Sequence, residues 1–469
     1  MKLPTWLQAA SSGVLLVLAF PPFAFWPLAW VAFVPLFLAL DDAPDAKAAA
    51  NLGAVAGLAF YVPALHWIVK VFGPMGGAFW CVFALWIGLH ASLSWWTARR
   101  WAAARPGLWL AAVGVGWIGQ EYFRSEIWKL QCSWLALGYT QVAFPPLLRS
   151  VSLFGVYGLS GLIVAANAAL ALAVRGRRGP ARAVFALVLG LGVWGASWPK
   201  PERGRAITAA AVQDESYDIP KMAKLSLGPD ARRADLLVWP EYGFTVQPNS
   251  EEPMRKLLAR QLRGTKAVAV LGAAIFPEDL RKDWEQNFAW VLAPDGAFLG
   301  RYDKHHPIPF VEPRLKPNRD PRPIATPLGK VGVQICYDLD FEDGPRRVQA
   351  LGAEILAVPD IDPYEWGAFQ HRQHSAMSPV RAVETGLWIV RAASSGLSQI
   401  VAPDGTVRAE LPPLTSGVAV GEARMTAGGT VYTRFGWLLP KLCLLLTAGF
   451  LLWLGAELYR TRSVKSRIS

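Results

Sequence analysis

The sequence predicts a polytopic α-helical membrane bundle of about eight spans joined to a layered α/β domain. Apolar residues make up 53% of the 469 residues and charged residues only 17%, which is unusual for a soluble protein. Long apolar stretches fill residues 1–198 and return after residue 434, whereas the intervening sequence is polar with short β-rich runs. We therefore predict a bundle of about seven transmembrane helices over 1–198, an α/β domain over 199–434, and a transmembrane helix with a tail over 435–469.

Eight apolar stretches predict the spans, because a membrane helix needs about 20 largely apolar residues. They are residues 6–20, 25–40, 50–72, 78–98, 108–122, 151–174, 183–198 and 435–458. The first two and the fifth are short or interrupted by proline, so their limits are the least defined. The 22 tryptophans fit a protein that meets both membrane interfaces.

The distribution of basic residues predicts the orientation, because short cytoplasmic loops are enriched in Lys and Arg. Basic residues gather on one side of the bundle: Arg99, Arg100, Arg105, Arg175, Arg177, Arg178, Arg182, Arg460, Arg462, Lys465 and Arg467. The acidic loop 41–49 on that side is an exception. We expect cytoplasmic termini, with 199–434 outside the cytoplasm. The same clustering between apolar stretches argues that the net charge of +12 reflects membrane topology and not nucleic-acid binding.

The polar region alternates short β-rich runs with helical patterns, which is typical of a layered α/β domain. Predicted strands cover 206–213, 234–241, 267–276, 288–296, 331–338, 353–360, 387–395 and 398–405. Helical patterns occupy 252–262 and 370–385, and "APDG" at 293–296 and 402–405 predicts hairpin turns.

Three chemically distinct side chains lie at strand ends or in the loops that follow. They are Glu241 in "LLVWPEYGF", Lys304 in "GRYDKHHPIPFVE" and Cys336 in "VGVQICYDLDF". An acid, a cation and a thiol suffice for acyl transfer through a thioester. Glu241 would take the thiol proton, while Lys304 would lower the thiol pKa and stabilise the oxyanion together with a backbone N–H near Tyr337. Taken singly, each of the three is more often structural.

No metal or cofactor site is predicted, because the four cysteines form no CxxC or Cys/His ligand spacing. His371 and His374 fit one helix face without a third ligand nearby, so we expect them to face solvent. The adjacent His305 and His306 likewise predict no metal site.

The three motifs carry a resemblance to a known family. "VWPEYGF", "YDKHHPIPF" and "ICYD" resemble, in this order, the Glu, Lys and Cys motifs of the nitrilase, or carbon-nitrogen hydrolase, superfamily, and "RAVETG" at 381–386 resembles its following helix. Seven apolar spans before the domain and one after it resemble the apolipoprotein N-acyltransferase branch, as do "LAFPPFAFWPLAW", "SWLALGYTQ" and "TRFGW". The resemblance covers nearly the whole chain. It implies an extracytoplasmic, nitrilase-like αββα sandwich.

The resemblance also implies a reaction. Cys336 would take an acyl chain from a phospholipid and pass it to the α-amine of a diacylglyceryl-cysteine lipoprotein. The expected phospholipid is phosphatidylethanolamine. Glu241 would be the base of both steps and Lys304 would stabilise the oxyanion. Glu312 in "PFVE" would orient Lys304 or the substrate, with Tyr337 and Asp338 as supporting residues after the nucleophile. A monomer in the bacterial inner membrane, without cofactor, is expected.

Several positions depart from the family pattern. "AVQDESYDIPKMAK" and "VPDIDPYEWGAFQH" lack expected Asn and Trp residues, and the segment 312–336 is shorter and more polar. These departures keep open an acyltransferase with another amine acceptor, a membrane-anchored amidase or hydrolase, and an inactive scaffold. The intact Glu241, Lys304 and Cys336 argue against a scaffold. Eight spans argue against a hydrolase, which needs only an anchor.

Overall fold

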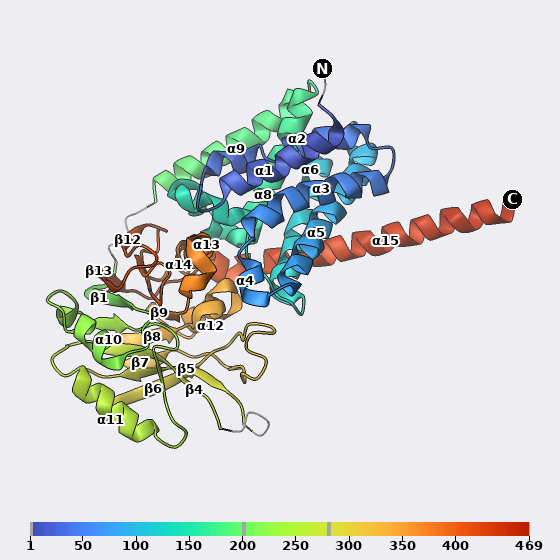
Figure 1. The fold of residues 1–469 in the computed structure, drawn as a ribbon. Helices are drawn as coiled ribbons and strands as arrows, with labels where there is room; N and C mark the ends of the chain where they lie inside the picture. The colour runs from blue at the N-terminus through green and yellow to red at the C-terminus, as the bar shows by residue number, and fades with distance from the viewer. Residues whose placement is uncertain (1–2, 199–202, 279–282, 469) are drawn as a thin grey trace.

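The computed structural model describes residues 3–198, 203–278 and 283–468, and it places an α/β domain at one end of a helical bundle (Figure 1). The main helices of the bundle are α1 (Thr5–Ala19), α2 (Val34–Ala39), α3 (Ala46–Ala64), α4 (Ile68–Phe72), α5 (Met75–Thr97), α6 (Pro106–Tyr122), α8 (Val151–Val174), α9 (Arg178–Ala196) and α15 (Leu438–Ile468). The predicted boundary at 198–199 falls beside residues 199–202, outside the described residues. The first strand of the domain begins at Arg205.

Among the described residues, four helices are long and apolar enough to cross a membrane: Met75–Ala102, Val151–Val174, Arg178–Ala196 and Tyr432–Glu457. Helix α1 is apolar but has only 15 residues. The predicted span 25–40 is two short helices, Trp26–Trp30 and α2, and each of them starts with a proline in its first turn. Proline lacks the N–H that a continuing helix needs, which accounts for the break.

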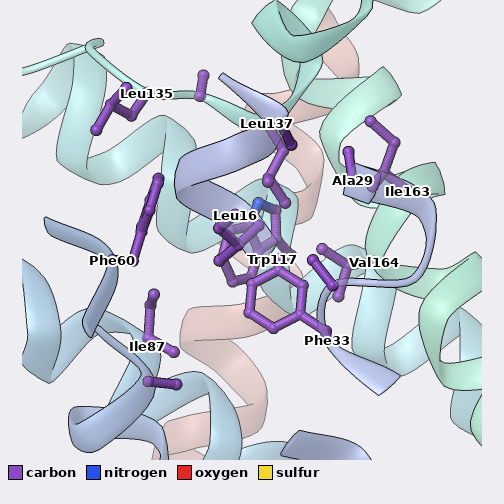
Figure 2. Packing of buried hydrophobic residues seen from close by; sticks show 14 of the residues in the cluster. Leu16, Ala29, Phe33, Phe60, Ile87, Trp117, Leu135, Leu137, Ile163 and Val164 are labelled. Atoms are coloured by element: carbon purple, nitrogen blue, oxygen red, sulfur yellow. The ribbon is translucent and has the colours of Figure 1, made fainter. Parts of the chain in front are cut away.

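Small residues bring the helices of the bundle into close contact. A Cβ added at Gly13 in α1 would lie 2.4 Å from the Ala56 carbonyl oxygen in α3, and one at Gly57 would lie 2.5 Å from the Ala84 Cα in α5. Such contacts let helices associate where apolar burial alone gives no driving force. Larger side chains fill the centre, where the ring of Phe33 packs edge-on against Trp117 (Figure 2).

The α/β domain contains two sheets packed face to face. The first has the order β13-β1-β2-β4-β5-β6, with β3 beside β4, and the second has the order β12-β11-β10-β9-β8-β7. The strands are β1 (Arg205–Gln213), β2 (Leu236–Val238), β3 (Phe244–Thr245), β4 (Val268–Ile275), β5 (Gln286–Leu292), β6 (Phe298–Asp303), β7 (Ile324–Thr326), β8 (Gly329–Val333), β9 (Ile355–Asp360), β10 (Ile389–Ala393), β11 (Gln399–Val401), β12 (Val407–Glu410) and β13 (Gly417–Met425).

Helices cover the outer face of each sheet. Side chains such as Val238 and Val333 form the core between the sheets. Helices α10 (Ile219–Ser226) and α11 (Glu251–Gln261) pack on the first sheet, and α12 (Asp343–Ala350) and α14 (Met377–Thr385) pack on the second. The order helix, sheet, sheet, helix confirms the predicted αββα sandwich.

Helix α13 (Gly367–Ser375) joins the domain to the bundle. The Gln373 carboxamide accepts a hydrogen bond of 3.0 Å from the Trp67 indole and donates one of 2.9 Å to the Ala64 carbonyl. In α14, the Glu384 carboxylate accepts the Val156 backbone N–H at 2.8 Å. The domain is therefore tied to the ends of α3 and α8.

Candidate active site

Glu241 lies three residues beyond β2 and is fully buried. Its Oε1 accepts hydrogen bonds from the Lys304 ammonium, at 2.8 Å, and from the Asn287 amide. Its Oε2 has no hydrogen-bond partner among the described residues. Burial raises the pKa of Glu241 to about 7, with Lys304 opposing the shift and Glu312 adding to it. Glu241 therefore has an oxygen and a pKa suited to proton transfer near neutral pH.

Lys304 follows β6 directly, and two carboxylates hold its ammonium in the protein interior. Its Nζ lies 2.8 Å from Glu241 Oε1 and 2.9 Å from Glu312 Oε2. Burial disfavours the charged form, but Glu241 and Glu312 outweigh it and keep the pKa of Lys304 well above its usual value. Glu312 also accepts the Tyr242 hydroxyl at 2.9 Å. The structure thus brings together the predicted Glu241, Lys304 and Glu312.

Cys336 begins a 3-10 turn just after β8, and its backbone adopts a φ of +48°. For a residue with a Cβ this left-handed conformation costs roughly 1 kcal/mol. The sulfur is buried and donates a weak hydrogen bond of 3.7 Å to the Ile361 carbonyl. Burial, Glu241 and Asp360 raise the pKa of the Cys336 thiol well above its usual value, and Lys304 only partly opposes them. The lowering of the thiol pKa expected from Lys304 is therefore outweighed. A base must take the thiol proton before the sulfur can react as a thiolate.

Asp338 connects the 3-10 turn Cys336–Asp340, which we call the nucleophile turn after the predicted role of Cys336, to the segment that carries Lys304. Its Oδ2 accepts the Ile335 N–H at 2.9 Å and the Tyr302 hydroxyl at 3.0 Å. Its Oδ1 accepts the backbone N–H groups of His305, at 3.0 Å, and His306, at 2.6 Å. With four donors from both sides, this buried carboxylate positions Cys336 relative to Lys304.

Tyr337 points away from the sulfur toward the bundle, where its hydroxyl donates to the Gln131 carbonyl. It also lines an apolar cavity between the bundle and the domain. The cavity walls include Leu65, Trp67, Phe72 and Phe79 from the bundle, together with Ile308, Phe310 and Tyr337 from the domain.

The prediction that His371 and His374 face solvent is wrong, because both are buried. His374 contacts the Asp362 carboxylate at 2.8 Å through Nδ1, and its ring stacks on Trp134 with 5.1 Å between centroids. The helical pattern predicted over 370–385 is interrupted after Ser375, where α13 ends. The polar residues of α13 face inward.

Sequence reasoning missed several polar groups of the site. Asn287, Asp360 and Arg391 are fully or almost fully buried polar residues within strands β5, β9 and β10. A polar residue inside an otherwise apolar strand was the available signal, since buried polar groups need dedicated partners.

Two protein-family models match the two parts of the chain. The apolipoprotein N-acyltransferase N-terminal domain model matches residues 12–169, and the carbon-nitrogen hydrolase model matches residues 205–430. An apolipoprotein N-acyltransferase of Geobacter metallireducens is 32% identical, with 92% of this chain and 91% of that protein covered. The chain belongs to the apolipoprotein N-acyltransferase family.

Other members of the apolipoprotein N-acyltransferase family are less similar in sequence but match over a similar share of both chains. The Vibrio cholerae protein of that name is 26% identical, with 95% of this chain and 96% of that protein covered. Among solved structures, a carbon-nitrogen hydrolase from Helicobacter pylori G27 is 17% identical with a TM-score of 0.41, covering 51% of this chain and 93% of its own. An amidase from Nesterenkonia sp. is 22% identical with a TM-score of 0.41, covering 50% and 94%.

Proposed function

We propose that this protein transfers an acyl chain from a phospholipid, through a thioester on Cys336, to the N-terminal amine of a diacylated lipoprotein. The observation that carries the proposal is the buried ion cluster of Glu241, Lys304 and Glu312 beside Cys336. Membership of the apolipoprotein N-acyltransferase family supports the choice of substrates.

The proposed chemistry has two halves. In the first, the Cys336 sulfur attacks the ester carbonyl and a lysophospholipid leaves. In the second, the amine attacks the thioester and the thiol is restored. Glu241 transfers protons in both halves, and the Lys304 ammonium stabilises the negative oxygen of each tetrahedral intermediate. Glu312 fixes Lys304, and Asp338 and Tyr337 hold the nucleophile turn and its cavity.

The apolar cavity beside Tyr337 is the proposed site of the acyl chain. Its walls come from both the bundle and the domain, so a lipid tail in it would lie between them. Phe310, one of the residues that line this cavity, is 56% exposed. An exposed phenylalanine side chain is unfavourable in water but favourable against lipid. We take phosphatidylethanolamine as the donor. We take a monomer as the working unit.

The proposed topology has eight spans in the inner membrane, cytoplasmic termini and a periplasmic domain. Helix α8 supports it: beyond a kink at Gly155, its continuous part, residues 156–174, extends roughly 28 Å, close to the thickness of the hydrocarbon core. Its first turns contact the domain through Glu384. At its other end Arg175 pairs with Asp41 at 2.6 Å and Arg177 donates to the Ala102 carbonyl, so basic loops meet away from the domain.

Mass spectrometry of the purified protein incubated with phospholipid tests the proposal. An acyl adduct on Cys336 is expected, and it should be absent in Cys336→Ala. Adding a diacylated lipopeptide should then give the triacylated product. Free fatty acid instead of that product would indicate a hydrolase, and no adduct in a preparation where a control family member acylates would refute acyl transfer.

A further inference from the structure

A second cluster of buried charges lies beside Cys336, on elements other than those of Glu241 and Lys304. It contains Asp360 at the end of β9, Asp362, Arg391 in β10, His374 in α13 and Asp340 in the nucleophile turn. The Cys336 sulfur, a carboxylate oxygen of Asp360 and a ring nitrogen of His374 all lie within 4.8 Å of one another. The backbone also joins the two clusters, because Glu241 N–H donates to the Asp360 carbonyl at 3.3 Å.

Arg391 occupies the centre of this cluster, which makes it an ion network and not a metal site. Its Nη2 donates to Asp360 Oδ2 and, at 2.6 Å, to Asp362 Oδ2. His374 lies between Asp362, at 2.8 Å, and Asp340, at 3.3 Å. Burial disfavours the imidazolium, but Asp360 and Asp362 outweigh it and raise the pKa of His374 well above its usual value. Both cations are therefore charged.

The charges of the network do not balance. Three carboxyl groups face two cations, so one carboxyl group can hold a proton without leaving a cation unpaired. Asp360 and Asp340 both have buried oxygens with no hydrogen-bond partner among the described residues. Asp360 is the candidate, because one of its carboxylate oxygens lies within 4.8 Å of the Cys336 sulfur. Burial raises the pKa of Asp360 to about 6, with Arg391 and His374 opposing the shift and Asp362 adding to it. Asp362, with both oxygens paired, has its pKa held well below the usual value: burial is outweighed by His374 and Arg391.

We propose that Asp360 is a second acid–base group of the reaction and exchanges a proton with the Cys336 sulfur, while Glu241 serves the substrate oxygen and nitrogen. This inference rests on the proposed acyl transfer. It assigns one carboxyl group to the sulfur and the other to the substrate atoms. Arg391 and His374 are then positioning residues that hold Asp360 toward the sulfur.

Protons balance over the whole cycle. In the first half, the Cys336 proton passes to Asp360, a C–S bond forms, and protonated Glu241 gives its proton to the departing lysophospholipid oxygen. In the second half, ionised Glu241 takes a proton from the attacking amine, the C–S bond breaks, and Asp360 returns its proton to the sulfur. The enzyme regains its starting protonation without an external acid or base.

Single-turnover acylation of Cys336 by phosphatidylethanolamine, without acceptor and over a range of pH, tests the proposal. In the wild type the rate should rise as Asp360 ionises and fall again as Glu241 ionises. In Asp360→Asn the rate should drop about a hundredfold, a typical contribution of one acid–base group, and should rise only as Glu241 ionises at higher pH. Asp404→Asn, a buried aspartate paired with Arg149 at 3.2 Å, is the control and should retain the wild-type profile.

An unchanged rate and profile in Asp360→Asn would refute the role of Asp360 alone, whereas a wild type that never acylates would refute the proposed function itself. If Asp360→Asn does not fold, Glu241→Gln decides the question through alkylation of Cys336 by iodoacetamide, followed by peptide mass spectrometry. The alkylation should still rise with the ionisation of Asp360. A Cys336 that has lost this pH-dependent rise would overturn the proposal.

Discussion

Lys304 is central to the charge balance of the site, because it is the cation that two buried carboxylates share. Glu241 and Glu312 both contact its ammonium, and all three side chains are buried. A buried charge is tolerated only with partners of opposite sign, so removing the ammonium exposes the carboxylates to each other.

Lys304→Met should abolish the Cys336 acyl adduct and lower the free energy of unfolding by about 3 kcal/mol, as expected for a broken buried ion pair. Adduct mass spectrometry and chemical denaturation in detergent measure the two effects. Lys330→Met, at an exposed lysine, is the matched control and should change neither. Wild-type acylation by the Lys304→Met variant would show that the ammonium has no part in catalysis.

Asp338→Asn should weaken the connection between the nucleophile turn and the lysine segment. The amide keeps the size of the carboxylate but turns an NH2 group toward two of the four donors, which should cost about 2 kcal/mol. We expect a lower melting temperature and slower acylation. Tyr302→Phe, which removes one donor only, should have a smaller effect on both; an equal effect would contradict the four-donor account.

At the scale of elements, the predictable part of the site comes from strand ends. The apolar runs before Glu241 and Cys336 form β2 and β8, Lys304 directly follows β6, and the packing of the two sheets brings these three strand ends together. β6 itself was not predicted as a strand, because its sequence "FLGRYD" lacks a clear apolar alternation. The sequence does not distinguish Arg391 from other residues of its strand, because its partner Asp360 lies on a different strand.

Helix α13 shows why the remainder was not predictable. Its polar residues face inward because the bundle and the nucleophile turn supply partners that are distant in sequence: Trp134 lies 240 residues before His374. A pattern within one helix carries no information about such partners. The same holds for β1, whose antiparallel neighbour β13 lies at the far end of the domain.

Gln373→Ala should loosen the attachment of α13 to the bundle. The Trp67 indole and the Ala64 carbonyl would lose their partner, at a cost of roughly 1–3 kcal/mol. Thermal unfolding in detergent measures the loss, and we expect acyl transfer to fall with it. Arg372→Ala, on the exposed side of the same helix, is the control; equal destabilisation by both would mean that the helix as a whole, and not this link, matters.

At the scale of the whole molecule, the domain and the basic loops lie at opposite ends of the bundle. The proposed orientation predicts the accessibility of introduced cysteines in a background of Cys81→Ser, Cys132→Ser and Cys443→Ser. In intact spheroplasts, a membrane-impermeant maleimide should label Asp295→Cys in the domain. Arg105→Cys, in a basic loop, should react only after permeabilisation; the opposite pattern would invert the topology.

The pairing of β1 with β13 has a consequence for synthesis of the chain. The nine pairs between them join residues about 200 positions apart, and translation at 5–20 residues per second needs roughly 10 to 40 seconds to cover that distance. During this interval β1, once outside the membrane, presents an open strand edge that invites pairing with other chains. In the proposed orientation, with the domain in the periplasm, biogenesis of the protein should therefore depend on how soon β13 follows β1 across the membrane.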